Sequence, residues 1–149
     1  MGTWDFGSFE NDTACDWVYD LKPAKKSLFG KLKFDPFAYP TKAITTVLNA
    51  NEYIESPECD EAIAAAECIA AAISNPITNL PDEVIAWKKS LKELKPSETL
   101  VQQTIDAVNR IRNAEQSEAR ELWSEGQDDG QVDPQWLASI DDLLSRLSA

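Results

Sequence analysis

The sequence predicts an all-α protein, a single compact bundle of about six helices with an irregular aromatic N-terminal arm. Three observations support this fold class. Apolar residues recur at the spacing of a helix face in successive segments, prolines and capping residues stand where these segments begin, and alanines crowd the run from Ala62 to Ala72. No internal repeat or linker divides the chain, so residues 1–149 are expected to form one domain, long enough to bury a core.

The arm is the aromatic segment 1–10, and we expect its Trp4 and Phe9 to fold back onto the helices. Asn11 or Asp12 is a suitable N-cap for the first helix, because a short polar side chain can accept a hydrogen bond from a free backbone N–H. Pro23 helps to end this helix, whose apolar face contains Ala14, Trp17, Val18 and Leu21.

Residues 22–40 are predicted to form a basic loop, because Gly30, Pro36 and Pro40 interrupt any regular pattern. The loop has room for a short strand over 28–34. A helix is then expected from Pro40 or Thr41 to about Ala50.

The strongest helix signal begins at Ser56-Pro57, a hydroxyl cap followed by a proline whose missing N–H costs nothing in the first turn. This helix should run from Pro57 to about Ser74. Its seven alanines between Ala62 and Ala72 would let neighbouring helices approach closely, which predicts a central position.

Four more helices are expected in the second half of the chain. One begins at Pro81 and ends near Ser90, and a long apolar stripe from Leu100 to Ile111 follows. A short helix comes after Ser117, then a polar loop over 125–132, and Asp133-Pro134 begins the last helix. The residues predicted to be largely buried are Trp17, Ile63, Ile69, Ile105, Val108, Trp123, Leu143 and Leu144.

Several classes of enzyme are excluded by composition. The chain has no histidine, three dispersed cysteines and no Gly-rich phosphate loop, so it lacks the usual Ser-His, Cys-His and zinc machinery. We therefore predict no catalytic residue and no cofactor. The absence of a signal sequence and of a membrane span, together with three unpaired cysteines, favours a cytoplasmic protein with no membrane contact.

The charge is large and unevenly distributed. A net charge of −12 argues against nucleic-acid binding. Residues 22–42 hold six lysines against Asp35, whereas residues 115–142 hold nine acids against Arg120. The acidic segment would attract a basic protein, although plain solubility accounts for it equally well. The predicted partner-binding residues are Glu118, Glu121, Glu125, Asp128, Asp129 and Asp133.

An alternative hypothesis assigns the chemistry to carboxylates on the first and third predicted helices. Asp12, Asp16 and Glu67 could hold a metal ion or act as acid and base. The more ordinary interpretation is that acids spaced by a helical turn form a solvated face. For Glu67 we expect a hydrogen bond from the N-terminal arm, or exposure to water.

The sequence resembles DUF4259, a bacterial family of unknown function. The motifs that carry the resemblance are Met1-Gly2-Thr3-Trp4, Gly7, Phe9-Glu10-Asn11-Asp12, Ala14, Asp16-Trp17, Tyr53-Ile54, the run 61–67, Leu80-Pro81, Trp87, Ser117-Glu118, Glu121-Leu122-Trp123 and Trp136. The segment 22–42 and Asp5-Phe6 depart from the family pattern. The resemblance implies a bacterial, cytoplasmic, helical domain, and it supplies no activity and no catalytic residues.

These observations favour a non-enzymatic binding protein of the immunity or antitoxin kind, one that occludes a basic toxin such as a nuclease. Small size, missing catalytic groups and concentrated acidity motivate the hypothesis. The carboxylate-based metal protein and a housekeeping interaction domain are the alternatives, and the oligomeric state is left open.

Overall fold

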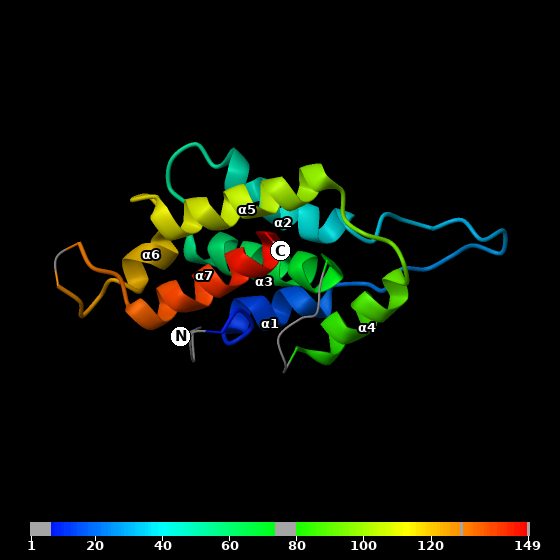
Figure 1. The fold of residues 1–149 in the computed structure, drawn as a ribbon, viewed down its shortest axis with the longest axis horizontal. Helices are drawn as coiled ribbons and strands as arrows, with labels where there is room; N and C mark the ends of the chain where they lie inside the picture. The colour runs from blue at the N-terminus through cyan, green and yellow to red at the C-terminus, as the bar shows by residue number, and fades with distance from the viewer. Residues whose placement is uncertain (1–6, 74–79, 129, 149) are drawn as a thin grey trace.

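The computed structural model describes residues 7–73, 80–128 and 130–148. Trp4 lies outside these residues, as does Asp129. Within them the chain forms seven helices and no sheet, which confirms the all-α prediction. The helices are α1 (Asp12–Tyr19), α2 (Ala38–Asn49), α3 (Ser56–Ile73), α4 (Asp82–Leu91), α5 (Glu98–Asn113), α6 (Glu118–Leu122) and α7 (Pro134–Ser148) (Figure 1).

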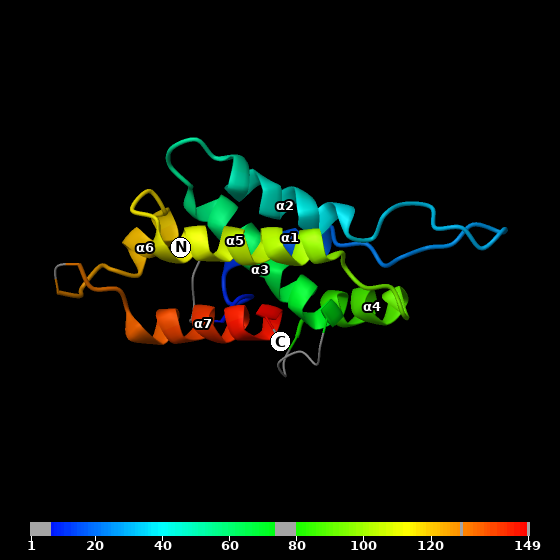
Figure 2. The ribbon, with the colours of Figure 1, turned by 45° about the horizontal axis from the view of Figure 1, so that its top comes forward.

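The helix α3 is the centre of the bundle. All six other helices contact it, and its alanines from Ala62 to Ala72 are all buried. Short side chains let several backbones pack against one helix at once. This arrangement confirms the central position predicted from the alanine run. The outer helices α2, α5 and α7 form a row, in which α7 runs antiparallel to α5 (Figure 2).

Local sequence signals set the helix boundaries close to where they are predicted. Asn11 caps α1 by accepting a hydrogen bond from the Ala14 N–H at 2.7 Å. Ser97 and Ser117 cap α5 and α6 in the same manner. The helix α2 begins at Ala38, two residues earlier than predicted, because Pro40 falls in the first turn, where its missing N–H has no helical partner to lose.

Most of the predicted core is buried. Trp17, Ile63, Ile69, Val108 and Leu143 are at most 6% exposed. The other three predicted core residues are partly buried and pack against the same cluster: Ile105, Trp123 and Leu144. Phe9 also packs against this cluster, as predicted for the arm.

Arg110 ties two of the outer helices together. Its guanidinium, on α5, donates hydrogen bonds to the carbonyls of Val47, Leu48 and Ala50 at the end of α2. These carbonyls have no partner within α2, and a cation is favoured at the negative end of a helix.

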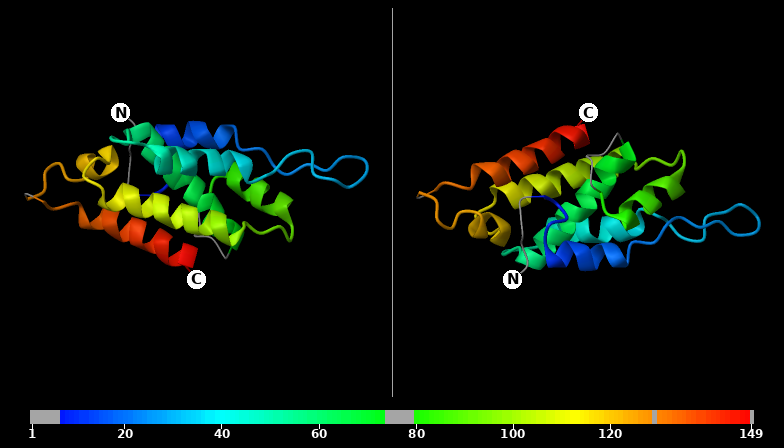
Figure 3. Two further views of the ribbon diagram at one scale, coloured as in Figure 1. Left: turned by 90° about the horizontal axis from the view of Figure 1, so that it is seen from above. Right: turned by 90° about the horizontal axis from the view of Figure 1, so that it is seen from below.

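The segment between α1 and α2 departs from the prediction of a strand over 28–34. The residues Ser27 to Gly30 form a turn, and only a single antiparallel bridge pairs Lys26 with Leu32. The strand is absent because the chain reverses within the predicted stretch, where Gly30 adopts φ of 80°. This hairpin projects from one end of the molecule, and the loop between α6 and α7 projects from the other (Figure 3).

Candidate functional site: the acidic end

The acidic end consists of residues 115–133, which comprise α6 and the segments on either side of it. A short parallel bridge holds it to the start of α3. The Ile54 N–H donates to the Gln116 carbonyl at 2.8 Å, and the Glu118 N–H donates to the Ile54 carbonyl at 2.9 Å. The bridge fixes α6 beside α3, and Ser117 is fully buried at this junction.

Three of the six predicted partner-binding residues have structural contacts. Glu118 accepts a hydrogen bond from the Ser56 N–H at 2.6 Å, so its carboxylate lies at the positive end of α3. Glu121 accepts one from the Tyr53 hydroxyl at 2.5 Å. Asp133 accepts one from the Gln135 N–H at 2.8 Å, in the first turn of α7. Their side chains therefore help to hold the acidic end in shape.

The remaining predicted residues differ from these three. Glu125 and Asp128 are exposed, and the described part of the chain offers their side chains no hydrogen bond or ion pair. Asp129 lies outside the described residues. The loop that carries Glu125 and Asp128 is held by its own backbone, since the Asp133 N–H donates to the Trp123 carbonyl at 2.8 Å.

A polar hollow of about 330 Å³ lies at the centre of the acidic end. Three carboxylates line it, from Glu115, Glu121 and Asp128, together with the single cation Arg120. Two partly exposed apolar groups belong to the same end, Leu122 at 45% exposure and Tyr53 at 44%. The sequence pattern indicated the acids but not Tyr53. Its hydroxyl contacts Glu121, which lies 68 positions later in the chain.

Asp60 adds a protonatable group to this end. Burial first, then the charges of Glu118 and Glu61, raises its pKa from an ordinary value near 3.8 to about 6. A cation bound nearby would lower that pKa again and release a proton.

The carboxylates of the alternative hypothesis are not assembled into one site. Asp12 and Asp16 are exposed on α1, whereas Glu67 is 1% exposed in the middle of α3. Among the described residues, no group of three or more His, Cys, Asp or Glu side chains is placed to hold a metal ion.

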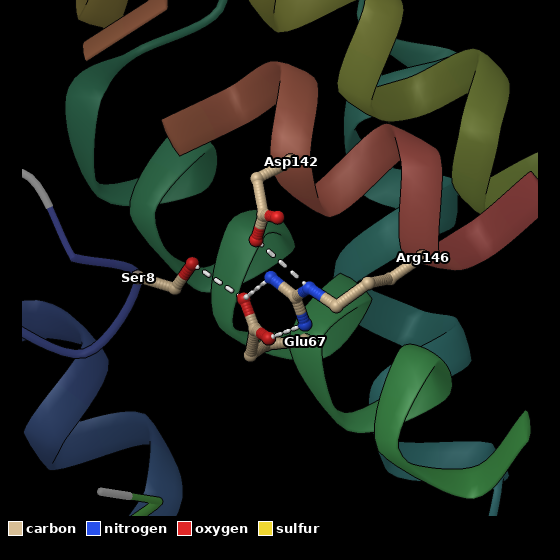
Figure 4. Close-up of polar contacts among 4 residues, drawn as sticks. All are labelled: Ser8, Glu67, Asp142 and Arg146. Atoms are coloured by element: carbon tan, nitrogen blue, oxygen red, sulfur yellow. Dashed lines mark hydrogen bonds and ion pairs between the residues drawn. The ribbon is translucent and has the colours of Figure 1, made fainter. Parts of the chain in front are cut away.

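Glu67 forms a buried ion pair instead (Figure 4). Both nitrogens at the end of the Arg146 guanidinium, from α7, donate to its two carboxylate oxygens. Ser8 of the N-terminal arm donates to Glu67 Oε2 at 2.8 Å, which confirms the expected hydrogen bond from the arm. Arg146 also pairs with Asp142 one turn earlier, at 2.9 Å. Protein donors thus occupy three of the roughly four acceptor sites of this carboxylate, and its charge is neutralised by Arg146.

The cysteines are free thiols within the described part of the chain. Burial raises the pKa of Cys59 to about 11 and also raises that of Cys68. Both thiols are therefore protonated at neutral pH, which is the unreactive form.

Fold and site together define an all-helical protein with a buried ion pair in its interior and an exposed acidic end. The chain belongs to the family described as a domain of unknown function (DUF4259), whose model matches residues 2–139. No curated protein and no solved structure matches the chain. No helix in the described ranges is long and apolar enough to cross a membrane.

Proposed function

We propose that the protein is a non-enzymatic binding protein whose acidic end receives the basic surface of another protein. One observation carries the proposal: the fold gathers the acids of residues 115–128 and Asp133 at one end of its long axis and the lysines of residues 22–33 at the other (Figure 1). A surface of one sign attracts an oppositely charged partner and speeds its capture.

The details of the acidic end suit a basic side chain. Glu115, Glu121 and Asp128 line a hollow with room for a lysine or arginine side chain, and Glu125 lies exposed in the same loop. The hydroxyl of Tyr53 is already oriented by Glu121, and aromatic groups of this kind are enriched in protein interfaces. A basic side chain could therefore find both a charge partner and an apolar neighbour.

The finer form of the proposal is an immunity or antitoxin protein that inhibits a basic toxin such as a nuclease. A nuclease binds phosphates through cationic groups, and carboxylates can occupy the positions of those phosphates. The metal-binding alternative finds no support in the geometry, because Arg146 and Ser8 engage the carboxylate of Glu67.

The experiment is affinity capture from cells with the protein as bait, followed by binding kinetics of the captured partner across a salt series. We expect a basic partner whose association slows steeply as salt rises, since long-range attraction is screened within ~8 Å at physiological ionic strength. The variant E125K/D128K should slow association about tenfold or more at low salt.

A matched control is E93K/D106K, which makes the same change in net charge at exposed positions outside the acidic end. It should leave association within about twofold of the original rate. Reversal of Glu118 or Asp133 is unsuitable as a test, because both contact helix N-termini. Capture of no basic partner, or equal effects of the two double variants, contradicts the proposal.

A further inference from the structure

The basic finger, residues 22–37, is a hairpin with a fixed base. At one side the Ala24 N–H donates to Ser90 Oγ at 2.7 Å, and at the other Trp87 Nε1 donates to the Pro36 carbonyl at 3.0 Å. Both of these partners belong to α4. The finger extends away from the helices beyond this base (Figures 1 and 3).

The tip of the finger exposes two large apolar side chains. The Ser27 N–H donates to the Lys31 carbonyl at 2.6 Å and the Lys33 N–H donates to the Lys25 carbonyl at 2.9 Å, which closes a tight turn. Leu28 and Phe29 occupy the turn and are 102% and 91% exposed. Moving such a side chain out of water is favourable, and the fold itself buries neither of the two.

Four lysines surround the apolar tip. Lys25 and Lys26 precede the turn, Lys31 and Lys33 follow it, and all four are exposed. The acidic end lies at the far end of the long axis. The helix α5 alone extends about 24 Å along that axis, well beyond the ~8 Å over which charge acts at physiological ionic strength. The finger therefore presents a positive surface despite the net charge of −12.

We propose that the basic finger docks on an anionic lipid bilayer, with Leu28 and Phe29 in the interface and the lysines against the headgroup phosphates. A bilayer can bury an apolar protrusion of any shape, whereas a protein partner would need a pocket complementary to two adjacent side chains. Each lysine beside an anionic leaflet strengthens the attachment about fivefold. The contact is peripheral and needs no spanning helix, so it departs from the sequence-based expectation of no membrane contact.

The test is cosedimentation of the purified full chain with vesicles of phosphatidylserine and phosphatidylcholine in equal parts. We expect the protein to sediment with these vesicles and not with pure phosphatidylcholine. The variant F29S should lower the partition coefficient about tenfold or more. K25Q and K31Q should each lower it about fivefold, the factor that corresponds to about 1 kcal/mol.

Two controls separate the finger from the rest of the surface. L122S removes a partly exposed leucine at the acidic end, and K42Q removes an exposed lysine of α2. Both should keep the partition coefficient within about twofold. Absence of vesicle binding, or equal losses in F29S and L122S, overturns the proposal. Concentration-dependent self-association without vesicles, abolished by F29S, also overturns it by assigning the finger to a second copy of the chain.

Discussion

Charged side chains in the interior of the bundle are buried and paired, whereas most of those at its two ends are exposed to water. In the interior, Glu67 is 1% exposed, and Arg146 and Ser8 bind its carboxylate. At the ends, Glu125, Asp128 and the lysines of the basic finger are exposed to water. A buried charge without a partner is costly, whereas an exposed one costs little and remains available. We therefore expect the interior charges to matter for stability, and the exposed charges at the ends to be the ones that are free to interact with other molecules.

The strongest test of this comparison breaks the interior pair. R146M leaves the carboxylate of Glu67 buried without its cation, so the free energy of unfolding should fall by about 3–5 kcal/mol. The double variant E67L/R146M should recover most of that loss, since apolar groups of similar size need no partner. Urea unfolding measures both effects.

Arg112 supplies the control for this test. Its ion pair with Asp141 also joins α7 to another helix, but Asp141 is 55% exposed. The variant R112M should therefore cost less than about 1 kcal/mol. If R112M and R146M lower the free energy of unfolding equally, burial does not make the Glu67–Arg146 pair more important for stability than the exposed pair.

Asp60 is neither fully buried nor fully exposed, and the stability of the protein should depend on pH through its carboxyl group. Its raised pKa means that the folded protein holds this proton more tightly than the unfolded chain. The resulting stability is fully present below about pH 3.8 and is lost as pH rises through about 6. Because Asp60 is partly exposed, D60N should stabilise the protein by only about 1 kcal/mol at neutral pH.

Thermal unfolding of D60N and of the original protein between about pH 4 and about pH 8 measures this effect. The difference in stability should be small at about pH 4, grow between about pH 4 and about pH 6, and level off above pH 6. D16N, at an exposed position of α1, is the matched control for the loss of one acid. A D60N variant less stable than the original at neutral pH would show that the charged form of Asp60 supports the fold.

The smallest expected effect on stability belongs to the tip of the basic finger. L28S/F29S should change the free energy of unfolding by less than about 0.5 kcal/mol, because neither side chain is buried. By contrast L143A, in the fully buried core, should cost about 2–5 kcal/mol. Urea unfolding of both variants makes the comparison. A large loss in L28S/F29S would assign the tip a structural role.

Particular residues show how much of the fold and of the site was predictable. Asn11 and Ser117 mark helix starts that the sequence predicts, because a cap acts on backbone groups only a few positions away. The buried partner of Glu67 was not predictable, since Arg146 is 79 positions away and its surroundings carry no local signal. Among the acids, sequence alone did not separate Glu118 and Asp133, which contact helix N-termini, from the exposed Glu125 and Asp128.

The sequence by itself determined the helical class, most helix boundaries and the central position of the alanine-rich helix. Each of these depends on propensity, periodicity or capping, which act within a few residues. Only the tertiary structure decided which carboxylates are buried, paired or exposed, and that the acidic end and the basic finger lie at opposite ends of the molecule. Those outcomes depend on how distant helices pack, because burial and pairing are properties of the space between segments and not of any one segment.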